Sequence, residues 1–199
     1  MRIKPCLITI LLFLAVEQGI LALEDKMNIE IFPFGQIENA ILEYLKDNLS
    51  KVFNAQVSIG LSTALPEYAY DKKRNQYLSS AILENLLKIK KGQSQKILAI
   101  IDKDLYVPEL NFVFGEADPL NGVCIISITR LHQSYYGFSE DKDLFLKRSL
   151  KEAVHEIGHL LNLRHCPNPE CVMHFSNSIL DTDRKDYHFC DDCKKLLPR

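Results

Sequence analysis

The sequence lacks an excess of charge of either sign: it has 24 basic and 26 acidic side chains and a formal net charge of −2. Basic residues form only short clusters, at positions 72–74 and 88–91. A chain of this kind offers little surface for a phosphate backbone, so we expect no nucleic-acid partner. Internal repeats, low-complexity stretches and a glycine-rich phosphate loop are also missing, which argues against repeat architectures and phosphate-loop nucleotide enzymes.

The composition is that of a compact globular domain. Of the 199 residues, 47% are hydrophobic and 25% are charged, which provides enough apolar side chains for one sizeable core. We therefore expect a single domain over residues 27–199, preceded by a leader over residues 1–26. We expect this domain to act as a monomer.

The leader contains the longest apolar stretch of the chain. A basic start at residues 1–4 is followed by an apolar run over residues 7–16. This order and length are typical of a secretory signal peptide, and the run is too short to cross a hydrocarbon core of about 30 Å with certainty.

The fate of the leader is open. Glu17 and Gln18 interrupt the apolar stretch before it continues to Leu23, and no clean small-x-small cleavage site follows. Three interpretations remain: cleavage near Ala22, retention as a membrane anchor, or a true translation start at Met27. The first two predict an exported or membrane-targeted protein, with membrane association only through the leader, and the third predicts a cytoplasmic one.

Helix and strand signals alternate along the rest of the chain. This alternation favours an α/β layer structure with a mostly parallel, mixed sheet packed by helices and room for one antiparallel edge strand. The predicted strands cover residues 28–32, 56–61, 96–102, 111–115 and 123–130, and the predicted helices cover residues 37–53, 76–89 and 141–161.

A histidine-rich segment near the C-terminus carries the strongest chemical signal. Residues 155–165 read HEIGHLLNLRH, which matches the zinc-protease pattern HExxHxxGxxH except at Asn162. His155 and His159 are four residues apart on a predicted helix, so both can offer a ring nitrogen to one zinc ion at about 2.0 to 2.1 Å. Glu156 follows the first ligand directly and is placed to act as general base.

The third ligand of this site is His165. It has to approach the metal from another direction than the helix, so the chain must turn sharply after His159. Asn162 stands where the pattern has glycine. Asparagine is the residue that tolerates the left-handed backbone conformation best after glycine, so we expect the turn at Asn162.

Three protein ligands leave the fourth zinc position open, which is typical of catalytic sites. Zinc lowers the pKa of a bound water and polarises a carbonyl group, and Glu156 can accept the proton and deliver it to the leaving amine. The alternative to this site is an amphipathic core helix whose histidines occur by chance. The presence of His165 at the required spacing favours the metal site.

Two cysteine pairs follow the histidines. Cys166 and Cys171 form a C-x4-C pair, and Cys190 and Cys193 form a C-x-x-C pair. Four thiolates complete a tetrahedral zinc coordination, so a second zinc here would be structural. Such binding contributes roughly 10 to 16 kcal/mol of apparent folding free energy in small domains. The alternative is two disulfides or free thiols, and an oxidising compartment would favour disulfides.

The combined pattern resembles the archaemetzincin family of zinc metalloproteases, which belongs to the metzincin clan. The family joins HExxHxxGxxH to C-x4-C-x-M and a later C-x-x-C. Here the later parts read CPNPECVM over residues 166–173 and CDDC over residues 190–193. The resemblance extends to segments 111–117, 127–131 and 175–178, and it covers roughly residue 27 to the end.

The resemblance implies a single metzincin-like domain with an active-site helix that bears HExxH and a zinc-stabilised C-terminal segment. It implies two zinc ions per chain and Glu156 as the acid/base residue. The ligands implied are His155, His159 and His165 for the catalytic zinc, and Cys166, Cys171, Cys190 and Cys193 for the structural zinc.

The resemblance also implies features around the metal. Met173 looks like the methionine of the turn beneath the zinc in metzincins. A sheet edge above the cleft would accept an extended peptide by strand addition, and we assign that edge to residues 123–129. Two departures from the family are Asn162 and the sixteen residues between Met173 and Cys190, one fewer than the family pattern. Neither involves a ligand.

We interpret the chain as a zinc-dependent metallopeptidase that hydrolyses peptide bonds through a zinc-bound water activated by Glu156. Its partner would be a peptide or protein substrate. Two alternatives are a catalytically silent, zinc-stabilised binding or scaffold protein and a zinc hydrolase of a non-peptide acyl substrate. Glu156 favours an enzyme, because a purely structural metal site needs no carboxylate beside its first ligand.

Overall fold

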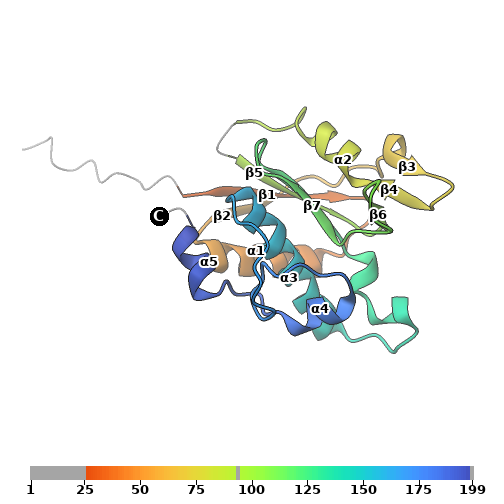
Figure 1. Ribbon diagram of the computed structural model, residues 1–199. Coiled ribbons are helices and arrows are strands. Elements are labelled where there is room, and N and C mark those ends of the chain that lie inside the picture. Colours follow the sequence, from red (N-terminus) through yellow and green to blue (C-terminus); the bar gives the residue numbers. More distant parts are fainter. Residues whose placement is uncertain (1–25, 93–94, 198–199) are drawn as a thin grey trace, which may run out of the picture.

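The computed structural model describes residues 26–92 and 95–197. These residues form three layers, with a sheet between two layers of helices (Figure 1). The predicted leader lies outside these residues, apart from Lys26. Within the described part of the chain, no helix is long and apolar enough to cross a membrane.

The central sheet has five strands in the order β2-β1-β5-β8-β7. The first four strands in this order run parallel to their neighbours, and β7 pairs antiparallel with β8 at the edge. This is the predicted mostly parallel, mixed sheet with an antiparallel edge. The strands are β1 (Asn28–Phe34), β2 (Gln56–Ile59), β5 (Gln95–Ile101), β7 (Gly115–Asp118) and β8 (Val123–Ser127).

Helices cover both faces of this sheet (Figure 1). The helices α1 (Asn39–Phe53) and α3 (Lys142–Leu160) pack against one face and against each other, and α2 (Ser79–Leu86) packs against the other face. Side chains of a strand alternate between the two faces. In β5, Leu98 and Ile100 therefore join the core under α1 and α3, whereas their neighbours join the core under α2.

The long predicted helix over residues 141–161 is α3. Asp141 begins it as N-cap, where Oδ1 accepts a hydrogen bond from the backbone N–H of Leu144 at 2.9 Å. Apolar side chains at helical spacing, among them Leu150 and Ile157, are buried against the sheet and α1. The other side of the last turns of α3 carries polar residues, among them His155, Glu156 and His159.

A second, small sheet lies beside the first and was not predicted. It has the order β3-β4-β6, formed by β3 (Tyr70–Asp71), β4 (Gln76–Leu78) and β6 (Leu105–Tyr106). The predicted helix over residues 76–89 is therefore wrong at its start. Residues 76–78 pair with β3 and with β6, and helix α2 begins only at Ser79.

The predicted sheet edge is wrong. We assigned it to residues 123–129, but all five residues of β8 are buried, and β8 pairs with β5 on one side and β7 on the other. The edge strand is β7, which begins where the predicted strand over residues 111–115 ends. Residues 111–114 form a loop with one isolated bridge at Val113. An edge strand needs fewer apolar side chains than a central one, which explains why β7 was missed.

The C-terminal segment crosses beneath α3 and carries two short helices, α4 (Ile179–Arg184) and α5 (Asp191–Leu196) (Figure 1). A capping box starts α4: the Ser178 side chain accepts from the third helical residue, Asp181, whose carboxylate accepts from the backbone N–H of Ser178. Buried side chains of this segment, including Val172, Met173 and Phe189, join the core under α3.

Candidate zinc centres and active-site cleft

Helix α3 places two histidines on one face. The Nε2 atoms of His155 and His159 lie 3.1 Å apart, and the rings meet edge to face with centroids 4.7 Å apart. This follows from their spacing of four residues, which brings side chains one above the other on a helix. His155 is buried, and His159 is partly buried.

The turn after α3 brings His165 to the same point. Asn162 has φ 64°, the left-handed conformation expected for it, and the N–H of Leu163 donates to the carbonyl of Gly158. The chain thus reverses within three residues. One ring nitrogen each from His155, His159 and His165 lies within 4.8 Å of the other two.

Hydrogen bonds to backbone carbonyls determine which nitrogen can bind a metal. His155 Nδ1 lies 2.7 Å from the carbonyl oxygen of Val172, and His159 Nδ1 lies 2.8 Å from that of Leu163. A carbonyl oxygen only accepts, so both Nδ1 atoms carry the proton. The Nε2 lone pairs are therefore free and point to the shared site, which is the usual arrangement for histidine ligands of zinc.

The three histidines fit zinc. A tetrahedral zinc with Zn–N distances of about 2.0 to 2.1 Å requires ligand nitrogens about 3.3 Å apart, close to the 3.1 Å between His155 and His159. Burial lowers the pKa of all three imidazoles below the ordinary 6.5, most strongly for His155. The rings therefore stay neutral, which is the form that coordinates a metal.

Glu156 lies beside this site in a buried position. Burial raises the pKa of its carboxyl group well above the ordinary value, and the charge of Glu152 adds to the rise. The edge strand β7 packs directly against it: a Cβ built at Gly115 would lie 2.5 Å from Glu156 Oε1. Only a residue without a side chain leaves this space to the carboxylate.

These residues line one cleft of about 490 Å³. One wall is the polar face of α3, with Glu152, His155, Glu156 and His159. The segment after Met173 lines the cleft with Phe175, Ser176 and Asn177. The opposite wall comes from the loop before β7 and from β7 itself, with the lining residues Val107, Leu110, Asn111, Phe112, Val113, Phe114, Gly115, Glu116, Ala117 and Pro119.

Met173 is fully buried in a turn beneath α3. The N–H of His174 donates to the carbonyl of Cys171, which forms the turn, and a Cβ at Gly158 would lie 2.4 Å from Met173 Sδ. Gly158 thus lets the methionine pack close to the helix that carries the histidines. This is the position that the family resemblance implies for Met173.

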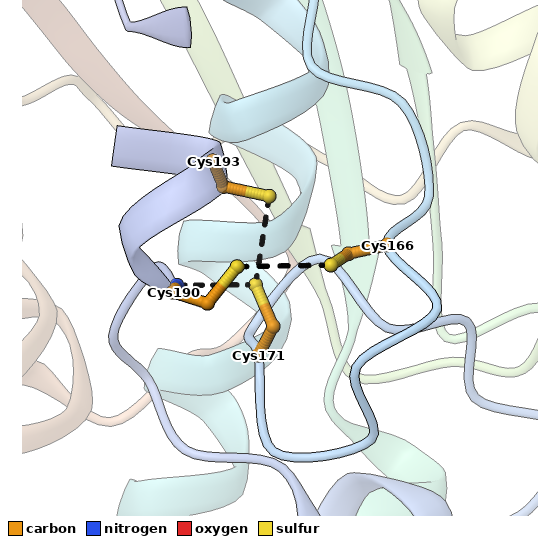
Figure 2. Close-up of side chains that lie close together, drawn as sticks. All are labelled: Cys166, Cys171, Cys190 and Cys193. Carbon is orange, nitrogen blue, oxygen red and sulfur yellow. Dashed lines mark hydrogen bonds between the residues drawn. The ribbon is translucent and has the colours of Figure 1, made fainter. Parts of the chain in front are cut away.

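The four cysteines predicted as a second site also come together (Figure 2). The sulfur of Cys166 lies 3.7 Å from that of Cys190, and the sulfur of Cys171 lies 3.7 Å from that of Cys193. Two of them come from the loop after His165, and two come from the start of α5. A tetrahedral zinc with Zn–S distances of about 2.3 Å requires sulfurs about 3.8 Å apart, so the donor set fits zinc.

The same distances exclude disulfide bonds, which need sulfurs about 2.05 Å apart. All four cysteines of the cluster are free. The backbone N–H of Cys193 lowers the pKa of Cys190 to about 7, while burial raises the pKa of Cys193 and of Cys166. At least one thiolate is therefore readily available at neutral pH, and a metal would be needed to deprotonate the rest.

Three other histidines do not join either site. His174 Nδ1 donates to the carbonyl of Cys166, and the exposed His188 pairs with Asp186. His132 pairs with Glu140 and stacks on Phe145, away from the cleft.

Comparison with known proteins shows the family of the chain. Residues 26–199 match the family model described as Peptidase family M54. The chain belongs to peptidase family M54. It is 42% identical to the archaemetzincin of Pyrococcus furiosus over 174 residues, which cover 84% of this chain and 90% of that protein. It is also 42% identical to the archaemetzincin of Methanocaldococcus jannaschii, with 86% and 93% covered.

Solved structures of similar proteins have the same fold. The crystal structure of archaemetzincin from Archaeoglobus fulgidus, complexed with malonate, matches with a TM-score of 0.75 at 37% identity and covers 86% of this chain and all of that one. A zinc-dependent peptidase from Methanocorpusculum labreanum matches with a TM-score of 0.79 at 32% identity and the same coverage. The predicted family, fold class and enzyme class are confirmed: the protein is a zinc metallopeptidase of the archaemetzincin family.

Four residues in or behind the cleft were not singled out from the sequence. The carbonyl of Val172, the bare backbone of Gly115 and the side chain of Ser176 come from segments whose place in space depends on the tertiary fold. Glu152 could have been found, because it precedes Glu156 by one helical turn and so lies on the same face.

Proposed function

We propose that this archaemetzincin hydrolyses peptide bonds with His155, His159 and His165 holding the catalytic zinc and Glu156 serving as the acid/base residue. The observation that carries the proposal is the convergence of the three ring nitrogens within 4.8 Å of one another in the cleft that Glu156 lines. All of these residues come from one chain, so we expect the monomer to be the active species.

Zinc, when bound there, supplies the Lewis acid that polarises the scissile carbonyl and lowers the pKa of water toward neutrality. Glu156 accepts the proton of the attacking water and then delivers it to the nitrogen of the leaving amine. Burial raises the pKa of its carboxyl group, which favours the protonated form that delivers the proton to the leaving amine. Gly115 keeps the carboxylate in place.

The edge strand β7 is the proposed docking site for the substrate backbone. Within the described residues, β7 pairs only with β8, so its outer row of N–H and C=O groups faces away from the sheet. Gly115, Glu116 and Ala117 of β7 line the cleft. An extended peptide that adds a strand there would pass between β7 and the histidines of α3.

A second, structural zinc is proposed at Cys166, Cys171, Cys190 and Cys193. Two sulfur pairs at 3.7 Å support the proposal. Four thiolates fill all four coordination positions of a tetrahedral zinc, so no position is left for water or substrate, as is typical of structural sites. The residues of both sites lie within residues 27–199, which we propose as the catalytic domain.

Metal analysis combined with one substitution tests the proposal. The purified protein should contain about two zinc ions per chain and should cleave members of a peptide library. Glu156→Ala should keep both ions and lose cleavage, whereas His159→Ala should lose one ion. Unchanged cleavage by Glu156→Ala would refute the assignment of the base. A wild-type protein with both ions but no cleavage of any peptide would instead indicate a silent zinc-stabilised scaffold.

A further inference from the structure

One wall of the cleft is a loop, residues 107–114, which leads from β6 to β7 and is called the wall loop below. It faces the polar side of α3 and contributes the lining residues Val107, Leu110, Asn111, Phe112, Val113 and Phe114. The loop ends at Gly115, whose backbone lies against Glu156. The position of the wall loop therefore determines how much room a substrate has between this wall and the histidines.

The backbone of the wall loop is attached to other elements only near its ends. The N–H of Val113 donates to the carbonyl of Leu105 in β6. Within the described part of the chain, residues 108–112 make a single backbone–backbone hydrogen bond, and it stays inside the loop, from Leu110 to Val107. Most of these residues are exposed. The middle of the loop therefore depends on contacts with side chains for its position.

Two side chains of the small sheet supply such contacts. Arg74 Nη2 donates to the carbonyl oxygens of Leu110 at 2.9 Å and of Asn111 at 3.1 Å. Gln76 Nε2 donates to the same carbonyl oxygen of Asn111 at 2.8 Å. Arg74 lies in the turn between β3 and β4, and Gln76 lies in β4. The small sheet thus holds the middle of the wall loop.

Arg130 holds the aromatic part of the wall loop. Its guanidinium carbon lies 4.0 Å from the centre of the Phe112 ring, which is a cation–π contact. Its Nε and Nη2 atoms donate to the two carboxylate oxygens of Asp104 at 2.6 and 2.7 Å. A planar guanidinium makes both contacts at once, because the carboxylate meets its edge and the ring meets its face. Gln76 Nε2 also donates to Asp104, at 2.9 Å, so all these side chains form one network.

The network lies on the far side of the wall loop from the cleft. Arg74, Gln76, Asp104 and Arg130, called the arginine network below, line a second depression of about 770 Å³. None of the four lines the cleft, whereas Asn111 lines both hollows. The wall loop is thus a partition between the two, and the arginine network can affect a substrate in the cleft only through this loop.

Resting on the proposed peptidase function, we propose that Arg74 and Arg130 are positioning residues for substrate binding, which hold the wall loop where it meets the peptide. A loop that leaves this place part of the time lowers the apparent affinity by the fraction of molecules in the competent conformation. The catalytic groups stay in place, because Glu156 belongs to α3 and Gly115 remains paired with β8. Loss of the arginine network should therefore raise KM and leave kcat nearly unchanged.

Steady-state kinetics of two variants test the proposal. Arg74→Ala removes an exposed side chain. The double variant Arg74→Ala with Arg130→Lys also removes the planar fork and its stacking face but keeps the charge at position 130. For a peptide that the wild type cleaves, KM should rise about threefold in the first variant and about tenfold in the second. Values of kcat should stay within about twofold of the wild type, with normal zinc content.

Lys73→Ala is the matched control, because it removes the neighbouring exposed charge of the same turn. It should keep the wild-type KM. A wild-type KM in the double variant, or an equal rise of KM in the control, would overturn the proposal. A fall in kcat at constant KM would also overturn it, since that is the effect of a smaller folded fraction.

A binding measurement separates this inference from the proposed function. A peptide hydroxamate chelates zinc and carries a peptide that can contact the wall loop, whereas acetohydroxamate chelates zinc alone. In the zinc-loaded double variant, the peptide hydroxamate should bind several-fold more weakly than in the wild type, and acetohydroxamate should bind equally well. This result supports the positioning role even if the wild type cleaves no peptide. Equal binding of the peptide hydroxamate, together with efficient cleavage by the wild type, would overturn the positioning role and leave the peptidase function intact.

Amide hydrogen exchange measures the wall loop without any metal or substrate. The N–H groups of Leu110 and Val113 both have backbone acceptors, so their exchange reports how often the loop opens. Exchange at both should be several-fold faster in the double variant than in the wild type and unchanged in Lys73→Ala. If neither hydroxamate binds the wild type, the zinc assignment fails, and this measurement still decides the inference. Unchanged exchange at both amides in the double variant would overturn it.

Discussion

His155 Nδ1 lies 2.7 Å from the carbonyl oxygen of Val172, the residue between Cys171 and Met173. The first histidine of the proposed catalytic site is thus oriented by the backbone of the cysteine cluster. A second link is covalent, because His165 directly precedes Cys166. Each cluster therefore helps to hold the other, and metal binding at the two should be coupled.

Opening the cysteine cluster should weaken both sites. Cys193→Ser removes one thiolate, so we expect the free energy of unfolding to fall by roughly 3 kcal/mol or more. Zinc affinity at the histidines should fall about 10- to 100-fold, as for other losses of an orienting partner. Denaturant unfolding and competition with a zinc chelator measure the two effects. Cys124→Ala, a buried cysteine outside the cluster, should leave zinc affinity unchanged. Normal affinity at the histidines of Cys193→Ser would contradict the coupling.

A methyl group at Gly115 should displace the base without removing the metal. The added Cβ would lie 2.5 Å from Glu156 Oε1, so the carboxylate has to move. A displacement of about 1 Å at a reacting group can cost about 100-fold in rate. We expect Gly115→Ala to lower kcat by about this factor with normal zinc content, as measured by steady-state kinetics and metal analysis. In Gly92→Ala the new Cβ meets no atom within 4 Å, and kcat should be unchanged. Wild-type kcat in Gly115→Ala would show that the strand does not position Glu156.

The left-handed turn at Asn162 should matter for both stability and metal binding. Asn162 has φ 64°, and alanine lacks the polar side chain that lets asparagine tolerate this conformation. Asn162→Ala should therefore lower the free energy of unfolding by roughly 1 kcal/mol. It should also make the position of His165 less fixed. Asn162→Gly should be at least as stable as the wild type at this turn. Chemical denaturation and zinc titration measure these changes.

Asn54→Ala is the matched control for the turn, because Asn54 is also left-handed, at φ 47°, at the end of α1. It should show a similar stability cost with normal zinc affinity. Equal zinc affinities of Asn162→Ala and the wild type would mean that His165 does not depend on this turn.

Zinc binding at the histidines should persist below the ordinary pKa of imidazole. Burial lowers the pKa of His155, His159 and His165 below 6.5 in the metal-free protein. Protons therefore compete with zinc only at pH values below these lowered pKa values. Affinity should stay nearly constant between pH 7.5 and about 6.5 and decrease only in more acidic buffer. Competition with a zinc chelator measures the zinc affinity of the histidines at each pH, in protein whose cysteine cluster already holds zinc. An affinity that already falls between pH 7.5 and about 6.5 would contradict this prediction.

The same lowered pKa values affect stability of the metal-free protein. An unfolded chain binds protons at its histidines near pH 6.5, whereas the folded chain does not yet do so. Stability from these groups is thus present above pH 6.5 and is lost as the pH falls through the lower folded pKa values.

Local patterns in the sequence determined much of this protein. The four-residue spacing of His155 and His159 and the tolerance of Asn162 for the left-handed conformation operate within one helix and its end, so they could be interpreted without a fold. The apolar run of β5 and the cap of α3 at Asp141 are also local signals, and both elements lie where they were predicted. The α/β class followed from the alternation of such signals.

The tertiary structure alone decided which strand forms the edge and what surrounds the base. The residues of β7 have no apolar alternation, and their strand exists because β8 offers it hydrogen bonds. The contact of Gly115 with Glu156, the ion pair of Glu152 with Lys185 and the bond of His155 to Val172 join segments that are far apart in the chain. Such contacts depend on how the layers pack, because a residue's own neighbours in sequence do not specify which distant segment will lie against it.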